Sequence, residues 1–113
     1  MKLPNSALAI VDDRKVADYL LHAAHPDNGG KARFFEALGY DQSDAEPLID
    51  ALRTVARNGE VIERVESPYG EKYVVVGLLV SHTEHVPRAV RTIWIIERGL
   101  AAPRFVTAYP SED

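Results

Sequence analysis

Cysteine is absent from the 113 residues of this chain. Its absence excludes disulfide bonds and thiolate zinc sites, and it fits a reducing compartment without requiring one. No stretch approaches the roughly 18 consecutive apolar residues of a membrane-spanning helix. The apolar run near the N-terminus is too short for a signal peptide, so we expect a cytoplasmic protein.

An excess of positive charge is also missing. The chain has 13 Lys and Arg against 17 Asp and Glu, which gives a net charge of −4 and a sequence pI near 5.5. Non-specific nucleic-acid binding depends on Lys and Arg that neutralise phosphates, so the composition argues mildly against it. A local basic cleft stays open as an alternative.

The composition is otherwise that of a globular protein, with 46% hydrophobic and 27% charged residues. This is enough apolar material for one core, and it predicts a single domain over residues 1–113.

Helical periodicity fills the first half of the chain. A first helix is predicted from Asp12 or Asp13, either of which can cap it, to about residues 22–24. A second is predicted from Lys31 to Leu38, before Gly39. A third begins with the capping-box pattern Ser43–Glu46, has Pro47 in its first turn and ends at Gly59.

After Gly59 the pattern changes to strands. A short strand around 61–65 and the turn Ser67–Gly70 precede Lys72–Val80, which is apolar on both faces and therefore predicted to be interior. The segments Val90–Glu97 and Arg104–Tyr109 form a closing hairpin. Helices followed by four consecutive strands predict an α+β fold, with the helices packed on one face of a four-stranded antiparallel sheet. The core is expected to contain Leu20, Phe34, Leu48, Leu52, Val55, Val75, Ile93 and Trp94.

The hairpin carries polar groups that a core does not need. Thr107 and Tyr109 alternate with apolar neighbours and share one side of the last strand. Arg91 shares a side with Ile93 and Ile95, opposite Trp94. A guanidinium there can bind an anionic ligand. The alternative is a residue at an edge or strand end that reaches water or pairs with a carboxylate. Whether Arg91 lies on the side of Thr107 depends on a hairpin register that the sequence does not fix.

A loop between the first two helices holds His25 and Lys31. Imidazole can transfer protons near neutral pH, and a lysine at a helix start attracts phosphate. The alternative is a surface turn with a solvated lysine.

A second pair, His82 and His85, lies in the segment 81–87 together with Glu84. Imidazole and carboxylate suit several divalent metals. The three-residue spacing aligns ligands only on a helix, however, and this segment is predicted to be a loop. We therefore expect neither a metal nor another cofactor.

One set of motifs is spread along the sequence: Leu3-Pro4-Asn5, Asp18–Leu21, His25-Pro26, Lys31–Phe35, Leu38-Gly39, Gly70 with Lys72-Tyr73, Val90–Trp94 and Thr107–Pro110. These motifs resemble an uncharacterised bacterial domain family that occurs as small stand-alone proteins and at the C-termini of large secreted toxins. The resemblance covers nearly the whole chain. The segment 81–87 departs from the family pattern, in which a turn richer in Gly and Asp stands there.

More distantly, the order of elements is similar to that of the barnase–EndoU–colicin–RelE group of metal-independent ribonuclease toxins. This resemblance implies a ribonuclease with functional side chains on the sheet. It implies a catalytic set of His25, Thr107 and Tyr109, with Lys31 and Arg91 holding the substrate phosphate.

The leading hypothesis is thus a ribonuclease of a toxin–antitoxin or toxin–immunity system, with RNA as substrate and an antitoxin or immunity protein as partner. Such a domain could be delivered to another cell. Two alternatives remain. One is a non-enzymatic binding module whose negative charge suits a basic partner. The other is a metal-dependent hydrolase built on His82, His85 and a carboxylate.

Overall fold

The computed structural model describes residues 1–22, 31–80 and 87–111. A four-stranded antiparallel sheet in the order β1-β2-β3-β4 follows the helical segments, which confirms the predicted α+β fold. The strands are β1 (Glu60–Ser67), β2 (Gly70–Val80), β3 (Pro87–Glu97) and β4 (Arg104–Pro110). β2 is an interior strand, as predicted, and β1 and β4 are the two edges.

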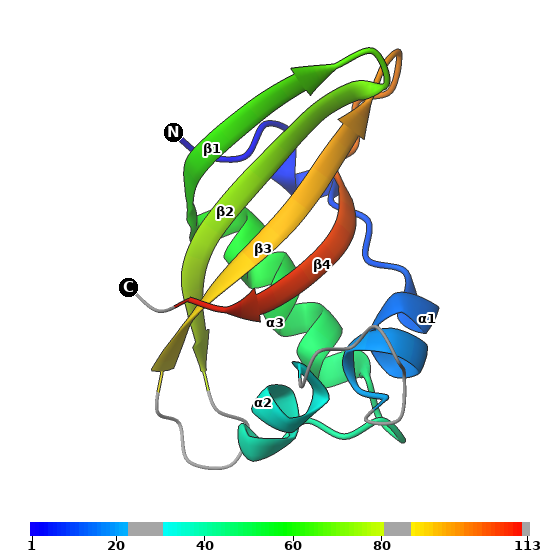
Figure 1. The fold of residues 1–113 in the computed structure, drawn as a ribbon, viewed down its shortest axis with the longest axis vertical. Helices are drawn as coiled ribbons and strands as arrows, with labels where there is room; N and C mark the ends of the chain where they lie inside the picture. Colours follow the sequence, from blue (N-terminus) through cyan, green and yellow to red (C-terminus); the bar gives the residue numbers. More distant parts are fainter. Residues whose placement is uncertain (23–30, 81–86, 112–113) are drawn as a thin grey trace.

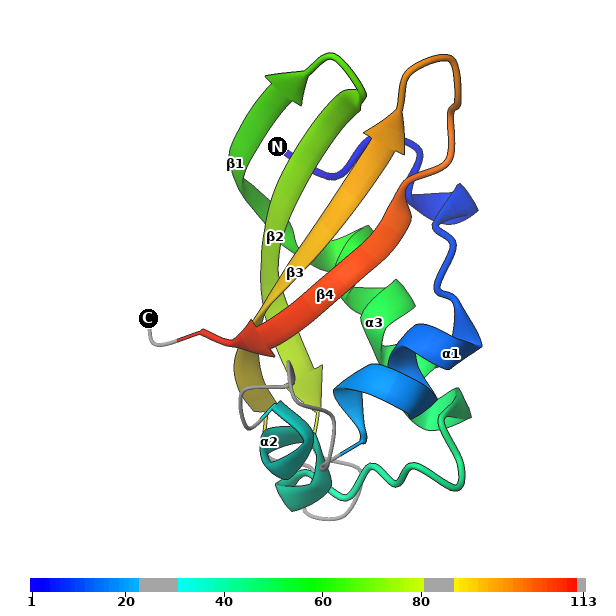
Figure 2. The ribbon, with the colours of Figure 1, turned by 45° about the vertical axis from the view of Figure 1, so that its right-hand side comes forward.

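The helical segments lie on one side of the sheet and at one of its ends (Figure 1). α3 crosses behind the strands, while α1 and α2 lie near the end where β4 finishes (Figures 1 and 2). The segments are η1 (Ser6–Leu8), α1 (Asp13–Lys15), η2 (Val16–Leu20), α2 (Lys31–Ala37) and α3 (Glu46–Asn58).

The predicted first helix is present as α1, which continues into the π-helical turn η2. Asp12 is its cap, because its carboxylate accepts a hydrogen bond from the Arg14 N–H at 2.8 Å. The second helix has nearly its predicted limits, and Gly39 follows it at φ 92°.

The start of the third helix was predicted wrongly. α3 begins at Glu46 after Ala45, without a side-chain cap. Ser43 does not act as the cap, because its N–H and its hydroxyl both donate to the Asp41 carboxylate, at 2.8 and 3.0 Å. Ser43 therefore belongs to a local turn stabilised by the Asp41 side chain, and the predicted capping box does not form.

Gly59 ends α3, as predicted, and it is also needed for close packing. Its φ of −73° is accessible to any residue. A Cβ at this position would lie 2.7 Å from the Val55 carbonyl oxygen and 2.7 Å from a Val75 methyl group. The chain passes from α3 into β1 at Gly59, where the neighbouring atoms leave no room for any side chain larger than that of glycine.

The core lies between the inner face of the sheet, which packs on α3, and the helical segments. Trp94 is fully buried there, with its ring edge-to-face against Phe105 at 5.4 Å between centroids. The core prediction is confirmed for Leu20, Leu48, Leu52, Val55, Val75 and Trp94. Phe34 and Ile93 are only half-buried, since Phe34 packs at the margin of the core and Ile93 lies on the outer face of the sheet.

The outer face of β2 is less covered than its apolar sequence suggested. Val74 is buried there, but Leu78 is 64% exposed. Within the described residues, no helix combines the length and the hydropathy that a membrane span requires.

Candidate functional site

The register of the closing hairpin places Arg91, Thr107 and Tyr109 on one face of the sheet. Arg91 pairs with Tyr109, and Ile93 pairs with Thr107. Residues directly opposite each other in an antiparallel pair share a face. This is the outer face, because the intervening Thr92 and its partner Ala108 are fully buried on the inner one.

A β-bulge makes this arrangement compatible with the core. The register shifts between Ile93 and Trp94, so that Trp94 pairs with Phe105 and Val106 is the extra residue. Simple alternation would put Phe105 and Thr107 on the same side. The bulge instead turns Phe105 into the core and leaves Thr107 outside it.

Lys31 joins this hairpin to the helical segments. It is the first residue of α2, and its ammonium group donates to the Tyr19 hydroxyl at 2.8 Å and to the Thr107 hydroxyl at 3.2 Å. The same nitrogen lies 5.1 Å from the centroid of the Tyr19 ring, in cation–π distance. Three elements thus meet at one half-buried lysine, and we call Tyr19, Lys31 and Thr107 the lysine cluster.

Arg91 and Tyr109 lie one rung further along the outer face. Arg91 is a diagonal neighbour of Thr107, and such neighbours are about 7–8 Å apart between backbones, within reach of long side chains. Arg91, Thr107 and Tyr109 are all half-buried. The register thus brings a guanidinium and a phenol to the side of the sheet on which Thr107 contacts the ammonium of Lys31.

Tyr19 is the member of the cluster that the sequence did not indicate. It falls within the helical spacing of the first apolar stripe, where it is indistinguishable from a core residue. A phenol is apolar along its ring and polar at its end, so Tyr19 packs against the core while its hydroxyl accepts from Lys31.

The histidines with a predicted role, His25, His82 and His85, lie outside the described residues. The described segments 1–22, 31–80 and 87–111 contain no group of three His, Cys, Asp or Glu residues that could hold a metal ion.

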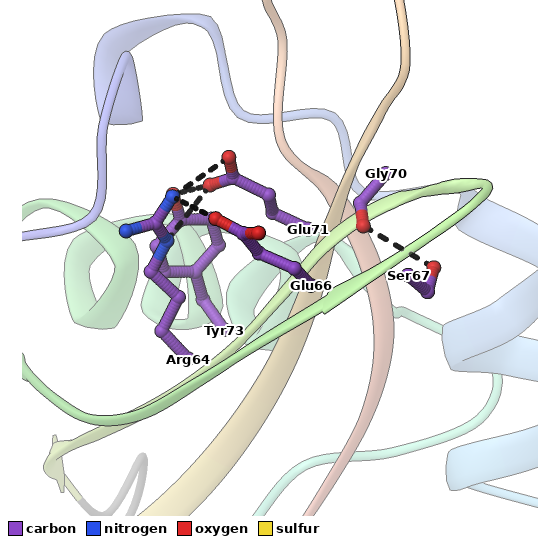
Figure 3. A network of polar contacts seen from close by, with 6 residues as sticks. All are labelled: Arg64, Glu66, Ser67, Gly70, Glu71 and Tyr73. Atoms are coloured by element: carbon purple, nitrogen blue, oxygen red, sulfur yellow. Dashed lines mark hydrogen bonds and ion pairs between the residues drawn. The ribbon is translucent and has the colours of Figure 1, made fainter.

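A second polar cluster braces the β1–β2 hairpin (Figure 3). The Arg64 guanidinium donates to both carboxylate oxygens of Glu71, at 3.0 and 2.8 Å, and to Glu66 at 3.0 Å. The Tyr73 hydroxyl also donates to Glu71. The hydrogen bonds from Arg64 and Tyr73 lower the pKa of Glu71, while burial and the contact with Glu71 raise the pKa of Tyr73.

This brace borders an open cleft of about 410 Å³ between the two hairpin turns. A carboxylate with a lowered pKa and two donors is a weak base near neutral pH. We therefore interpret Arg64, Glu66, Glu71 and Tyr73 as a structural brace and not as a catalytic centre.

Chemically, the lysine cluster and its neighbours on the outer face combine two cations with hydroxyl donors. Guanidinium and ammonium groups suit phosphate oxygens. Hydroxyl groups can position a reacting group or donate a proton to it. The arrangement fits an anionic substrate better than a metal ion or an apolar ligand.

The domain family described as Domain of unknown function (DUF6883) matches residues 2–112 of this chain. None of the curated proteins matches it. The fold is similar to that of one chain in the solved structure "Contact-dependent growth inhibition toxin - immunity protein complex from Klebsiella pneumoniae 342", with a TM-score of 0.71 and 14% sequence identity. The similarity covers 90% of this chain and 99% of that chain, and at this identity it shows a shared fold.

Proposed function

This chain belongs to the DUF6883 domain family, and we propose that it is a metal-independent ribonuclease domain of a bacterial toxin system. The observation that carries the proposal is the hydrogen bonding of Lys31 to Thr107, on the face of the sheet that also holds Arg91 and Tyr109. These residues come from α2, β3 and β4, and the core requires none of their polar groups.

The proposed reaction is attack of a ribose 2′-hydroxyl on the adjacent phosphate. A base takes the 2′ proton as the new P–O bond forms, the P–O5′ bond breaks, and an acid protonates the leaving 5′ oxygen. The products are a 2′,3′-cyclic phosphate and a free 5′-hydroxyl. The reaction consumes no water and changes no oxidation state.

The residues have separate roles in this reaction. Lys31 and Arg91 bind the phosphate and stabilise the charge that develops on its oxygens. Thr107 and Tyr109 position the substrate or donate a proton. His25 is proposed as the acid or base from its chemistry and its place in the loop before Lys31.

The toxin context rests on two likenesses. The sequence motifs resemble domains found at the C-termini of secreted toxins, and the fold resembles a chain in a complex of a growth-inhibition toxin with its immunity protein. We propose that the domain acts on RNA in the cytoplasm of a target cell, and that a cognate antitoxin or immunity protein restrains it.

One observation favours a second candidate. The net charge of −4 is unusual for a nuclease and suits a protein that binds a basic partner. On that alternative the chain is an antitoxin or immunity-type module, and the polar groups of the outer face are partner contacts.

Replacement of Lys31 distinguishes the two candidates. Lys31→Met keeps the length and the apolar part of the side chain but removes the ammonium group that contacts Thr107. Lys15→Met is a matched control, because Lys15 also donates to β4, at the Val106 carbonyl oxygen 3.2 Å away, without contacting Thr107.

We expect Lys31→Met to lower the rate of RNA cleavage about 10²-fold or more, as the loss of one preorganised donor does. Lys15→Met should cleave at the wild-type rate, and thermal melts should show both variants folded. Equal cleavage by Lys31→Met and wild type would exclude the lysine cluster as the active site.

A further inference from the structure

The two edges of the sheet are protected very differently. At the β4 edge, the Ile10 N–H donates to Pro103 and the Phe105 N–H donates to Ile10, both at 2.9 Å. At the β1 edge, the described residues supply one backbone partner, the Met1 carbonyl oxygen, which accepts from Val61 at 2.9 Å. From residue 62 to residue 67, β1 forms an open margin of the sheet (Figure 2).

This open edge also carries exposed apolar side chains. Ile62 is 50% exposed and Val65 is 41% exposed. Natural proteins usually shorten, bend or charge an edge strand, because its unpaired N–H and C=O groups pair readily with another strand. β1 has charged residues, but both signs are present on it, so it does not repel every partner strand.

Contacts within the single chain already hold β1 and the turn that follows it in place. Arg64 bonds to Glu71 on β2, and the Ser67 hydroxyl closes the turn on the Gly70 carbonyl oxygen at 3.2 Å. The Arg98 N–H ties the same turn to the β3–β4 connection through the Tyr69 carbonyl oxygen, at 2.8 Å. A preorganised strand loses little conformational entropy when it binds.

We propose that β1 pairs antiparallel with β1 of a second copy of this chain, with Val65 opposite Val65 on the two-fold axis. The two sheets then join into one continuous sheet. This proposal does not depend on the ribonuclease assignment.

The register follows from faces and charges. A two-fold axis perpendicular to a continuous sheet brings residues of the same face opposite each other, so the axis must pass through a residue of β1 and not between two. An axis through Glu63, Arg64 or Glu66 would place identical charges directly opposite, which is unfavourable. An axis through Val65 pairs two apolar side chains.

The same axis places each Arg64 opposite Glu66 of the other copy. Directly opposite side chains have Cβ atoms about 4.5–5.5 Å apart, close enough for an ion pair. Arg64 already lies 3.0 Å from Glu66 of its own strand, so its guanidinium is extended along this face of β1. One symmetry operation thus creates an apolar contact and two ion pairs of opposite charge.

A cysteine at position 65 tests this register directly, because the chain has no cysteine of its own. Opposed residues of an antiparallel pair have Cα atoms about 4.5–5.5 Å apart, within the range of about 4.4–6.8 Å that a disulfide spans. We expect purified Val65→Cys to form a disulfide-linked dimer under mild oxidation, seen on non-reducing gels.

Two other cysteine variants are the controls. Glu63→Cys faces Ser67 of the other copy in this register, and Tyr69→Cys lies in the turn, where Tyr69 is 78% exposed. Neither should cross-link at more than the rate of random collision. Cross-linking of Val65→Cys that is no faster than that of Tyr69→Cys would overturn the proposal.

Sedimentation of the unmodified protein gives an independent readout. Wild type should sediment with twice the 12.5 kDa mass of one chain as concentration rises, and Val65→Lys should remain at the single-chain mass. Wild type that stays monomeric at every concentration, or Val65→Lys that dimerises like wild type, would overturn the proposal. Neither cross-linking nor sedimentation measures RNA cleavage. Failure of the dimer proposal can therefore be distinguished from failure of the ribonuclease proposal.

Discussion

Thr92 is fully buried, and it links two strands through the core. Its hydroxyl accepts from the Trp94 indole N–H at 2.7 Å and donates to the Val75 carbonyl oxygen at 2.9 Å. Both partners are buried, so neither can exchange this hydrogen bond for one with water.

We predict that Thr92→Val lowers the free energy of unfolding by about 1–3 kcal/mol, because it leaves the buried indole N–H of Trp94 without an acceptor. Chemical denaturation measures the loss. Thr54→Val is the control, since Thr54 is exposed and its hydroxyl donates to its own helix at Asp50; we expect a change within about 0.5 kcal/mol. Equal losses in the two variants would contradict the role of the buried hydroxyl.

At the scale of single residues, the sequence indicated which polar groups were unusual but not which ones touch. Lys31 and Thr107 stood out because each interrupts or precedes an apolar pattern. Their contact joins residues 76 positions apart, and no local pattern carries that information. Tyr19 did not stand out, because its ring fits the helical apolar pattern. Its hydroxyl, which accepts the hydrogen bond from Lys31, leaves no mark on that pattern.

Among the elements, α3 shows how well periodicity predicts a buried face. Leu48, Leu52 and Val55 recur at helical spacing and are all buried. The predicted start was wrong, since a hydrogen bond to Asp41 occupies Ser43. Whether a serine caps a helix depends on which other side chains nearby can bond to it, and the capping-box motif does not include those neighbours.

We predict that Leu52→Ala lowers the free energy of unfolding by about 2–5 kcal/mol, through lost burial and the cavity that remains. Asp50→Ala on the exposed side of the same helix should change it by less than about 1 kcal/mol, because the Asp50 carboxylate forms an exposed ion pair with Arg53, and such pairs contribute little to stability. Denaturant titrations compare the two. A Leu52→Ala curve that overlays wild type would contradict the packing of α3.

The closing hairpin shows what strand alternation cannot predict. The sequence predicted both strands and placed Thr107 with Tyr109, which the register confirms. It could not predict the bulge at Val106, because a bulge adds one residue without changing the local composition. The face shared by Arg91 and Thr107 depends on pairing between strands and therefore needed the structure.

The brace on β1 and β2 predicts a pH dependence. The folded pKa of Glu71 lies below its unfolded value of about 4.5. A depressed carboxyl pKa contributes stability that is present above the unfolded pKa and lost as pH falls through the folded pKa. Wild type should therefore lose thermal stability below about pH 4.5, and Glu71→Gln should lose less over the same range.

Melting temperatures from about pH 7 to about pH 3 measure this difference. Glu63→Gln is the control on the same edge, because Glu63 is exposed and its carboxylate is not the one that Arg64 and Tyr73 contact. Parallel acid profiles of Glu71→Gln and wild type would show that the brace contributes nothing measurable.

At the scale of the whole molecule, the order of helices and strands predicted the α+β architecture, because the change of period after Gly59 separates two kinds of element. The sequence could not predict that one sheet edge is covered and the other open. That difference depends on where residues 1–11 run across the sheet.

The proposed active site and the proposed dimer interface lie at opposite edges of the sheet. The lysine cluster lies at β4, and the open edge lies at β1, with β2 and β3 between them. Pairing of two copies through β1 would leave the lysine cluster of each copy accessible to substrate. A partner that inhibits the proposed enzyme would therefore not need to separate the two copies.

Incubation of purified wild-type protein with total RNA, in the presence of a strong chelator, directly tests whether this domain is a metal-independent ribonuclease. The protein must first be shown to be folded and free of any bound inhibitor. We predict discrete cleavage with 2′,3′-cyclic phosphate ends, unaffected by the chelator because no step uses a metal ion. Arg91→Ala, which removes the proposed phosphate ligand on β3, should reduce this cleavage without unfolding the protein. Intact RNA after incubation with the folded, inhibitor-free wild type would contradict the ribonuclease assignment and favour the binding module.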